Sequence, residues 1–121
     1  MSFASQIKTI AKQMGAEVDQ VQRAITIEVF NSAIDNTRVD TGRARGNWQT
    51  TVTTPASGDL ETTDKSGATT KAKMVSAIKP KSLMVITNNL PYIGKLEELD
   101  GMVGKTIARI GRIIRERASG V

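Results

Sequence analysis

The sequence predicts a mixed α+β fold, with a long N-terminal helix and a C-terminal helix packed on a small antiparallel sheet beside one or two short helices. Three observations support this prediction: helical apolar spacing at the start of the chain, two strand-like runs in its middle, and an amphipathic, basic end. A chain of 121 residues is the length of one domain. We therefore expect residues 1–121 to form a single domain.

Residues 3–37 are expected to form a helix, because apolar residues recur at spacings of three and four. Gly15 interrupts this pattern and marks either a bend or the end of an N-terminal arm over residues 1–15. No proline precedes Pro55, so one continuous helix of about 50 Å is allowed. A helix of that length exceeds a small globule, and part of it is expected to pack on another chain. The stripe comprises Ile7, Ile10, Ala11, Met14, Val18, Val21 and Ile25, widened by Ala24, Ile27, Phe30 and Ile34.

Residues 36–42 are polar and rich in turn formers, and a strand is expected next, from Gly46 to Thr54. Strict alternation places Trp48 and Val52 on one face of that strand. Residues 56–70 are rich in Ser, Thr, Gly and Asp, which predicts a loop that is flexible in isolation.

A short helix is expected from Ala68 to Ile78, and a strand covered on both faces from residues 82–88, where the apolar run is continuous. Pro91 is suited to the first turn of a second short helix over residues 92–99. Gly101 ends that helix, and the last helix follows over residues 102–118. The expected apolar faces are Ala72, Val75 and either Ala77 or Ile78 in the first of these helices, and Ile107, Ile110, Ile113 and Ile114 in the last.

The composition excludes several kinds of chemistry. The chain has no Cys and no His, so it carries no disulfide, thiolate nucleophile or Cys-based metal site and lacks the usual general base near neutral pH. No apolar run is long enough for a membrane span, and the start of the chain does not resemble a signal peptide.

Three patterns in the sequence resemble functional sites: a phosphate-binding loop, a catalytic carboxylate pair and a calcium site. Gly104-Lys105-Thr106 matches the end of a phosphate-binding loop, but Leu99 stands where that motif needs its first glycine. Adjacent carboxylates such as Glu97 and Glu98 point about 100° apart on a helix and cannot serve one substrate together. The acidic residues of the loop lack the spacing of a calcium site; they are Asp59, Glu61 and Asp64. We therefore expect no catalytic, cofactor-binding or metal site, and no enzymatic activity.

The basic residues are distributed unevenly. The formal net charge is +5, and residues 101–121 hold five basic residues and one acidic residue. On the last helix, Lys105, Arg109 and Arg112 share one face, and Arg115 extends it. Two interpretations stay open: contact with DNA phosphates, or a solvated or protein-binding face. Other basic groups are Arg38, Arg43 and Arg45, and then Lys65, Lys71, Lys73, Lys79 and Lys81.

Two segments together resemble a known family. Residues 39–48, Val-Asp-Thr-Gly-Arg-Ala-Arg-Gly-Asn-Trp, resemble a "V-D-T-G-x-x-R-x-x-W/I" segment. Residues 86–93 with Leu96-Glu97 resemble "T-N-N-x-P-Y-A…L-E", and Gly101-Met102-Val103 leads into a final basic helix. Both are typical of the small neck or tail-completion proteins of tailed bacteriophages, the minor tail protein Z-like class. The matching positions are Val39, Asp40, Thr41, Gly42, Arg45, Trp48, Asn88, Asn89, Pro91, Tyr92 and Glu97.

The resemblance implies a structural virion protein without catalysis or cofactors, assembled in the host cytoplasm. It implies a homo-oligomeric ring of six or twelve copies at the head–tail junction or upper tail. The implied neighbours are other neck, tail terminator or tail tube proteins, with packaged DNA as a non-specific contact and no membrane. The alternative is a non-catalytic DNA-binding protein that uses the basic helix face. In place of the family's loop with Ser, Lys and Pro, this chain has residues 98–100.

The two motifs also have a simple structural interpretation. Asp40 and Thr41 can bond to amides of their own turn, and Gly42 can take a positive φ that reverses the chain. Asn88-Asn89 tolerates left-handed backbone. Tyr92 is expected to anchor the following helix with its hydroxyl free for a polar partner. On this interpretation the motifs specify the fold and are not themselves a binding site.

Overall fold

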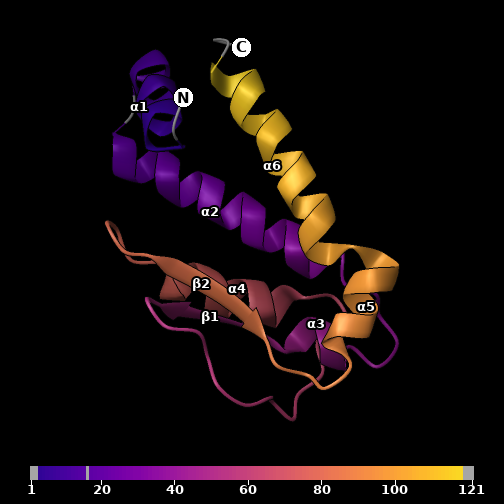
Figure 1. The fold of residues 1–121 in the computed structure, drawn as a ribbon. Coiled ribbons are helices and arrows are strands. Elements are labelled where there is room, and N and C mark those ends of the chain that lie inside the picture. Colours follow the sequence, from indigo (N-terminus) through magenta and orange to yellow (C-terminus); the bar gives the residue numbers. More distant parts are fainter. Residues whose placement is uncertain (1–2, 16, 119–121) are drawn as a thin grey trace.

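A computed structural model describes residues 3–15 and 17–118, and these form a mixed α+β structure (Figure 1). A two-stranded antiparallel sheet is accompanied by six helices within these ranges. No helix of this part of the chain is both long and apolar enough to cross a membrane. The elements are α1 (Phe3–Met14), α2 (Val18–Asp35), α3 (Arg43–Gly46), β1 (Trp48–Val52), α4 (Ala68–Ala77), β2 (Met84–Asn88), α5 (Ile93–Asp100) and α6 (Met102–Ala118).

The expected long N-terminal helix is two helices. Gly15 takes a φ of +66° and ends α1, and α2 begins afresh where the Glu17 amide donates to Gln20 Oε1 at 3.2 Å. α1 folds back to pack on α2 and α6. The prediction of one continuous 50 Å helix is therefore wrong, and the length of the first helix gives no reason to expect that it packs on a second chain. The cluster that joins α1 to α2 is Ile7, Ile10, Ala11, Val21 and Ile25.

The sheet pairs β1 with β2 in antiparallel register, with Trp48 opposite Asn88 and Thr50 opposite Ile86. Both strands are shorter than predicted, and the one-turn helix α3, which the sequence did not indicate, precedes β1. Every residue of β2 keeps partial exposure. The prediction of a strand covered on both faces is therefore wrong, because the two-stranded sheet has too few neighbours to enclose it.

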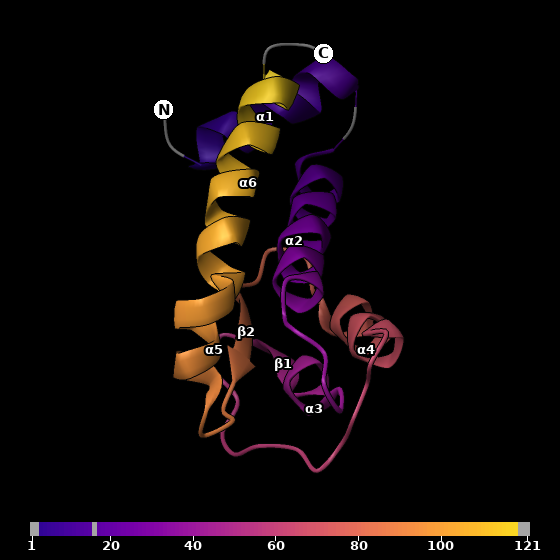
Figure 2. The same ribbon diagram turned by 90° about the vertical axis from the view of Figure 1, so that its right-hand side faces the viewer.

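A second core lies where α2, α6 and the sheet meet. Figure 2 shows α2 and α6 running side by side above the sheet, with α4 beside it. Trp48 is buried, and Met102 at the start of α6 is almost fully enclosed. The members of this core are Ala33, Ile34, Trp48 and Met102, with Ile86, Ile93 and Leu96 packed against them.

The short helices lie close to their predicted bounds, but α4 buries a different face. Met74 and Thr70 are its buried residues, whereas Ala72 is exposed. Gly101 takes a φ of +59° and separates α5 from α6, as predicted. The longer Met74 reaches the core from α4, which explains why the small residue at 72 is not needed there.

The prediction for the buried face of α6 is wrong at Ile107, which is 63% exposed. Met102 and Thr106 face α2 instead, and the roughly 100° turn per residue then directs Ile107 away from that contact. The side chains of Ile110, Ile113 and Ile114 lie outside the described part of the structure.

Candidate functional site

The Val39–Gly42 turn docks on the loop that follows β1. Gly42 has a φ of +89°, and a Cβ there would lie 2.6 Å from the Lys65 amide nitrogen. The Gly42 carbonyl accepts hydrogen bonds from the amides of Asp64 and Gly46, each at 2.9 Å. Only glycine fits this approach, which confirms the positive φ expected from the motif.

The two polar residues of this turn behave differently. Thr41 Oγ1 accepts a hydrogen bond from the Arg43 amide at 3.2 Å, as expected. Asp40 is exposed, and within the described residues its carboxylate has no hydrogen bond to the turn, which contradicts its expected role. Val39 is exposed as well. The first two motif residues are therefore presented to solvent.

Arg45 holds the end of α2 and the loop together. Its guanidinium donates to the carbonyls of Thr37 and Lys65, each at 2.8 Å, and to the Asp35 carbonyl at 3.2 Å. The last carbonyls of a helix have no partner within it. Arg45 supplies that partner for α2, so its motif position is structural. Its Nε atom is buried without a partner in the described structure.

Trp48 is linked to both long helices through Thr37. The indole Nε1 donates to Thr37 Oγ1 at 2.8 Å, and this hydroxyl donates to the Ala33 carbonyl at 2.8 Å and lies 3.1 Å from Met102 Sδ. Nearby, Thr106 Oγ1 lies 3.0 Å from Ser32 Oγ. Sequence reasoning missed this polar set because Thr37 and Thr106 lie outside the two family motifs and are 69 positions apart in the chain.

Asn88 and Asn89 act through their side-chain amides. Asn88 Nδ2 donates to the Ala44 carbonyl at 2.9 Å, and Asn89 Nδ2 donates to the Ala56 and Gly58 carbonyls at 2.8 and 3.0 Å. Neither is among the residues with positive φ. The expectation of left-handed backbone here is therefore wrong, and the pair instead fastens α3 and the loop to the end of β2.

Glu97 caps the last helix. Its carboxylate accepts hydrogen bonds from the amides of Val103 at 2.9 Å and Gly104 at 3.2 Å. The carboxylate thus occupies the helix start that a phosphate would need, which fits the structural interpretation of Gly104-Lys105-Thr106. Pro91 precedes α5 by two residues, and Tyr92 is exposed without a hydroxyl hydrogen bond in the described structure, so the expected anchoring is not observed.

An ion pair joins the end of α5 to the turn after α2. Arg38 Nη2 lies 2.6 Å from Asp100 Oδ1, and the Arg38 amide also donates to this carboxylate at 3.3 Å. The hydrogen bond from Arg38 lowers the pKa of Asp100 against the opposing effect of burial. This contact joins the turn that begins at Arg38 to the end of α5, two segments 62 residues apart in the sequence.

Asp64 orders the start of α4. Its carboxylate accepts hydrogen bonds from the Thr70 amide and Thr70 hydroxyl, both at 2.8 Å, and from the Gly67 amide at 3.2 Å. Burial opposes ionisation, but these hydrogen bonds and one from the Thr69 amide outweigh it and lower the pKa of Asp64. Across residues 3–15 and 17–118, no cluster of three acidic side chains suited to a metal is present.

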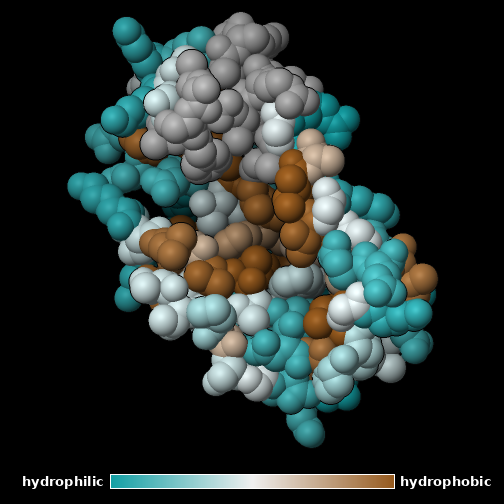
Figure 3. Space-filling view, in the orientation of Figure 1, coloured by the Kyte–Doolittle hydropathy of each residue, from teal (hydrophilic) through white to brown (hydrophobic). Residues whose placement is uncertain are grey.

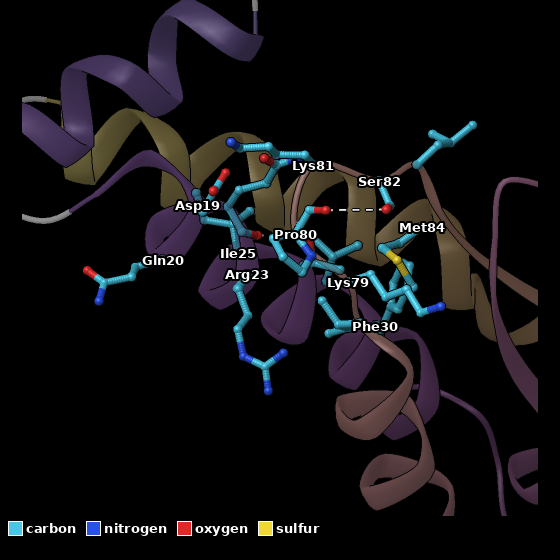
Figure 4. A pocket seen from close by; sticks show the side chains of 15 residues that line it. Asp19, Gln20, Arg23, Ile25, Phe30, Lys79, Pro80, Lys81, Ser82 and Met84 are labelled. Atoms are coloured by element: carbon cyan, nitrogen blue, oxygen red, sulfur yellow. Dashed lines mark hydrogen bonds between the residues drawn. The ribbon is translucent and has the colours of Figure 1, made fainter.

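A groove of about 680 Å³ runs between α2 and the segment 78–84 that leads into β2 (Figure 4). Ile25, Phe30 and Met84 form part of its apolar floor. The Ser82 hydroxyl donates to the Pro80 carbonyl at 3.3 Å and folds the segment into its rim. The charged residues along the groove are Asp19, Arg23, Lys79 and Lys81.

Large apolar side chains are exposed at several separate places. Leu83, at the groove, is 68% exposed, and Leu99, at the end of α5, is 59% exposed. Figure 3 shows apolar side chains gathered in a hollow between β2 and the helices α2 and α6. A contiguous exposed apolar area indicates an interaction surface, whereas single exposed apolar residues are normal on a protein surface.

The basic face of α6 is solvent-facing where it is described. Lys105, Arg109 and Arg112 are exposed, and none of them takes part in the ion pairs found in the described ranges. The Arg115 side chain lies outside the described residues. These cations lie on the side of the helix away from Val103 and Ile107, given the turn per residue.

No family model, curated protein or solved structure matches this chain. The resemblance to neck and tail-completion proteins therefore depends on the two motifs alone, and what it implies is argued below as a proposal.

Proposed function

We propose that this chain is a structural subunit of a tailed phage particle that forms a homo-oligomeric ring at the head–tail junction or upper tail and carries no catalytic activity. The ring has six or twelve copies, as the resemblance implies. It contacts neighbouring neck, terminator or tube proteins in the virion. Helices α1 and α2, which Gly15 separates, and the C-terminal helix α6 supply its frame.

The motif residues support a structural role. Gly42, Arg45 and Trp48 bond or pack to backbone and core atoms, and Glu97 caps a helix. Side chains committed in this way are unavailable to a substrate. Motif residues used in this way support a rigid framework, which a subunit of an assembly requires.

The observation that carries the proposal is the uncovered apolar surface. Leu83, Leu99 and Ile107 are each more than half exposed, on three different segments, and the apolar groove at Leu83 is open. Ring formation by one kind of subunit needs two different surfaces that fit each other. A chain with separate apolar surfaces meets that need.

The proposal is tested by the mass of the purified protein and by its place in the particle. We expect light scattering after size exclusion to give a concentration-dependent oligomer, and electron microscopy to show a ring where the tail meets the head. The proposal would be refuted if the purified protein stays monomeric at millimolar concentration and if particles that lack it assemble normally.

The alternative function is non-specific DNA binding through Lys105, Arg109 and Arg112, and it is favoured by their exposure without ion pairs. Three phosphate contacts give a slope of log affinity on log salt of about −2.7 for duplex DNA. The triple substitution of these residues by Gln should abolish that slope. Affinity that does not vary with salt would exclude this alternative.

A further inference from the structure

We propose that the groove between α2 and residues 78–84 receives the end of α5 from a second copy of this chain. The inserted surface is the acidic corner, defined as Val39, Asp40, Glu98 and Leu99. This inference rests on the proposed function, since it names the two surfaces by which subunits would join in a ring.

The groove is apolar inside and basic at its rim. Its floor is formed by Ile25 and Phe30, which are buried in the single chain, and by Met84, which is partly exposed. Leu83, which also lines the groove, is 68% exposed and is the apolar side chain most available to an occupant. The rim carries three cations, Arg23, Lys79 and Lys81, and one carboxylate, Asp19. All three cations are exposed, and no ion pair in the described ranges includes them. An occupant with an apolar tip and negative flanks would match this surface.

The acidic corner has that chemistry. Val39 and Leu99 are exposed apolar side chains. Val39 is followed by the exposed carboxylate of Asp40, and Leu99 is preceded by that of Glu98. The ion pair of Glu98 with Lys95 spans 4.0 Å between two exposed side chains, and such pairs contribute little. The Arg38–Asp100 ion pair holds the two halves of the corner together, so the corner is preformed.

The two surfaces lie at opposite ends of the molecule. In Figure 1, α5 is at the right, and the chain that enters β2 is at the left. A corner-to-groove contact therefore joins the front of one copy to the back of the next and extends in one direction, as a ring requires. Groove against groove would oppose like rims of cations, and corner against corner would oppose like carboxylates.

Cysteine cross-linking tests the pairing directly, because the natural chain contains no cysteine. Leu83→Cys and Leu99→Cys are made as separate proteins, mixed in equal amounts and oxidised mildly. We expect a disulfide-linked dimer in the mixture, several times more abundant than in either protein alone. The matched control is Leu83→Cys mixed with Glu61→Cys, an exposed position in the loop. Cross-linking no greater than in this control would overturn the inference.

Charge reversal gives a second test that does not depend on disulfide geometry. Arg23→Glu and Glu98→Lys should each lower the association constant by about tenfold, which is 1.4 kcal/mol. Mixing the two variants should restore association, because each reversed groove then meets a reversed corner in an alternating, even-numbered ring. Equal weakening in the mixture and in the single variants would contradict the pairing.

The outcomes separate this inference from the proposed function. Oligomers that form without Leu83–Leu99 cross-links would show that the ring uses other surfaces, and the proposed function would stand. Cross-linked assemblies of a protein that is absent from phage particles would support the pairing and refute the virion role.

Discussion

The Trp48 indole donates a hydrogen bond of 2.8 Å to Thr37 Oγ1, and through this one hydroxyl the first strand is tied to both long helices. Thr37 is almost fully buried and also bonds to the Ala33 carbonyl. A motif tryptophan is thus oriented by a residue from the turn before it.

We expect Trp48→Phe to lower the free energy of unfolding by about 1–3 kcal/mol, because Thr37 loses a buried donor and the smaller ring leaves a gap. Urea unfolding measures this change. Thr37→Val and the double variant complete a cycle, in which the double variant should cost less than the sum of the two single changes. Strict additivity would show that the bond contributes nothing.

Gly42→Ala should be strongly destabilising. The added Cβ meets the Lys65 amide at 2.6 Å and the φ is +89°, so left-handed strain of about 1–2 kcal/mol is joined by displacement of the loop. Gly58→Ala is the matched control, since its φ is +75° but no atom lies within 4 Å of the added Cβ. Thermal unfolding of both variants separates the two costs, and equal losses would contradict the close approach.

Arg45→Met should destabilise the chain by about 1–3 kcal/mol, because three carbonyl groups lose their donor. Arg45→Lys should recover part of this loss, because the lysine ammonium can donate a hydrogen bond to one of the three carbonyl groups. Arg43→Met is the control, since Arg43 makes an exposed pair with Asp59 at 2.9 Å and such pairs are worth about 0–1 kcal/mol. Chemical unfolding of the three variants compares them, and similar effects at 43 and 45 would contradict the clamp.

Glu97→Gln should weaken the start of α6 by about 0.5–1 kcal/mol, because an amide oxygen replaces a charged acceptor at a helix N-terminus. Hydrogen exchange of the Val103 and Gly104 amides reports the effect locally. Glu98→Gln, at the exposed neighbour, should leave both amides as protected as in the natural chain. Faster exchange in both variants would assign the protection to another cause.

Stability should fall in acid partly through Asp64. Hydrogen bonds lower its pKa in the folded state, so its contribution is present above the unfolded value of about 3.9 and is lost as the pH falls through the folded value. Thr70→Val removes one donor and should raise the folded-state pKa of Asp64 toward its unfolded value, so the acid-induced loss of stability should be smaller and should end at a higher pH. Urea unfolding between pH 7 and pH 2.5 measures this, with Thr69→Val as the control because Thr69 contributes only its backbone amide. An unchanged acid profile in Thr70→Val would contradict this role.

Local sequence signals predicted most elements of this fold. The alternation around Trp48, the apolar run before Asn88 and the breaks at Gly101 and after Ala77 reflect interactions within a few residues, and these elements occur close to their predicted places. The positive φ of Gly42 was also predictable, because a turn of that composition requires it.

The predictions were wrong where contacts with residues far away in the sequence decide the position or the burial of an element. Gly15 was seen as either a bend or an arm, and only packing against α6 selects the fold-back of α1. Ile107 was placed in the core by its periodicity, but the neighbours of α6 leave it exposed.

The sequence by itself determined the approximate places of most helices and of both strands, the lack of cysteine and histidine, and the basic end of the chain. Tertiary structure alone decided that Arg38 meets Asp100, that Glu97 caps α6, and that an apolar groove and an acidic corner lie at opposite ends. The physical reason is that periodicity records which face of an element is apolar, whereas the partner of that face is set by the tertiary arrangement. Arg38 and Asp100 are 62 residues apart in the chain, and Ser32 and Thr106 are 74 residues apart.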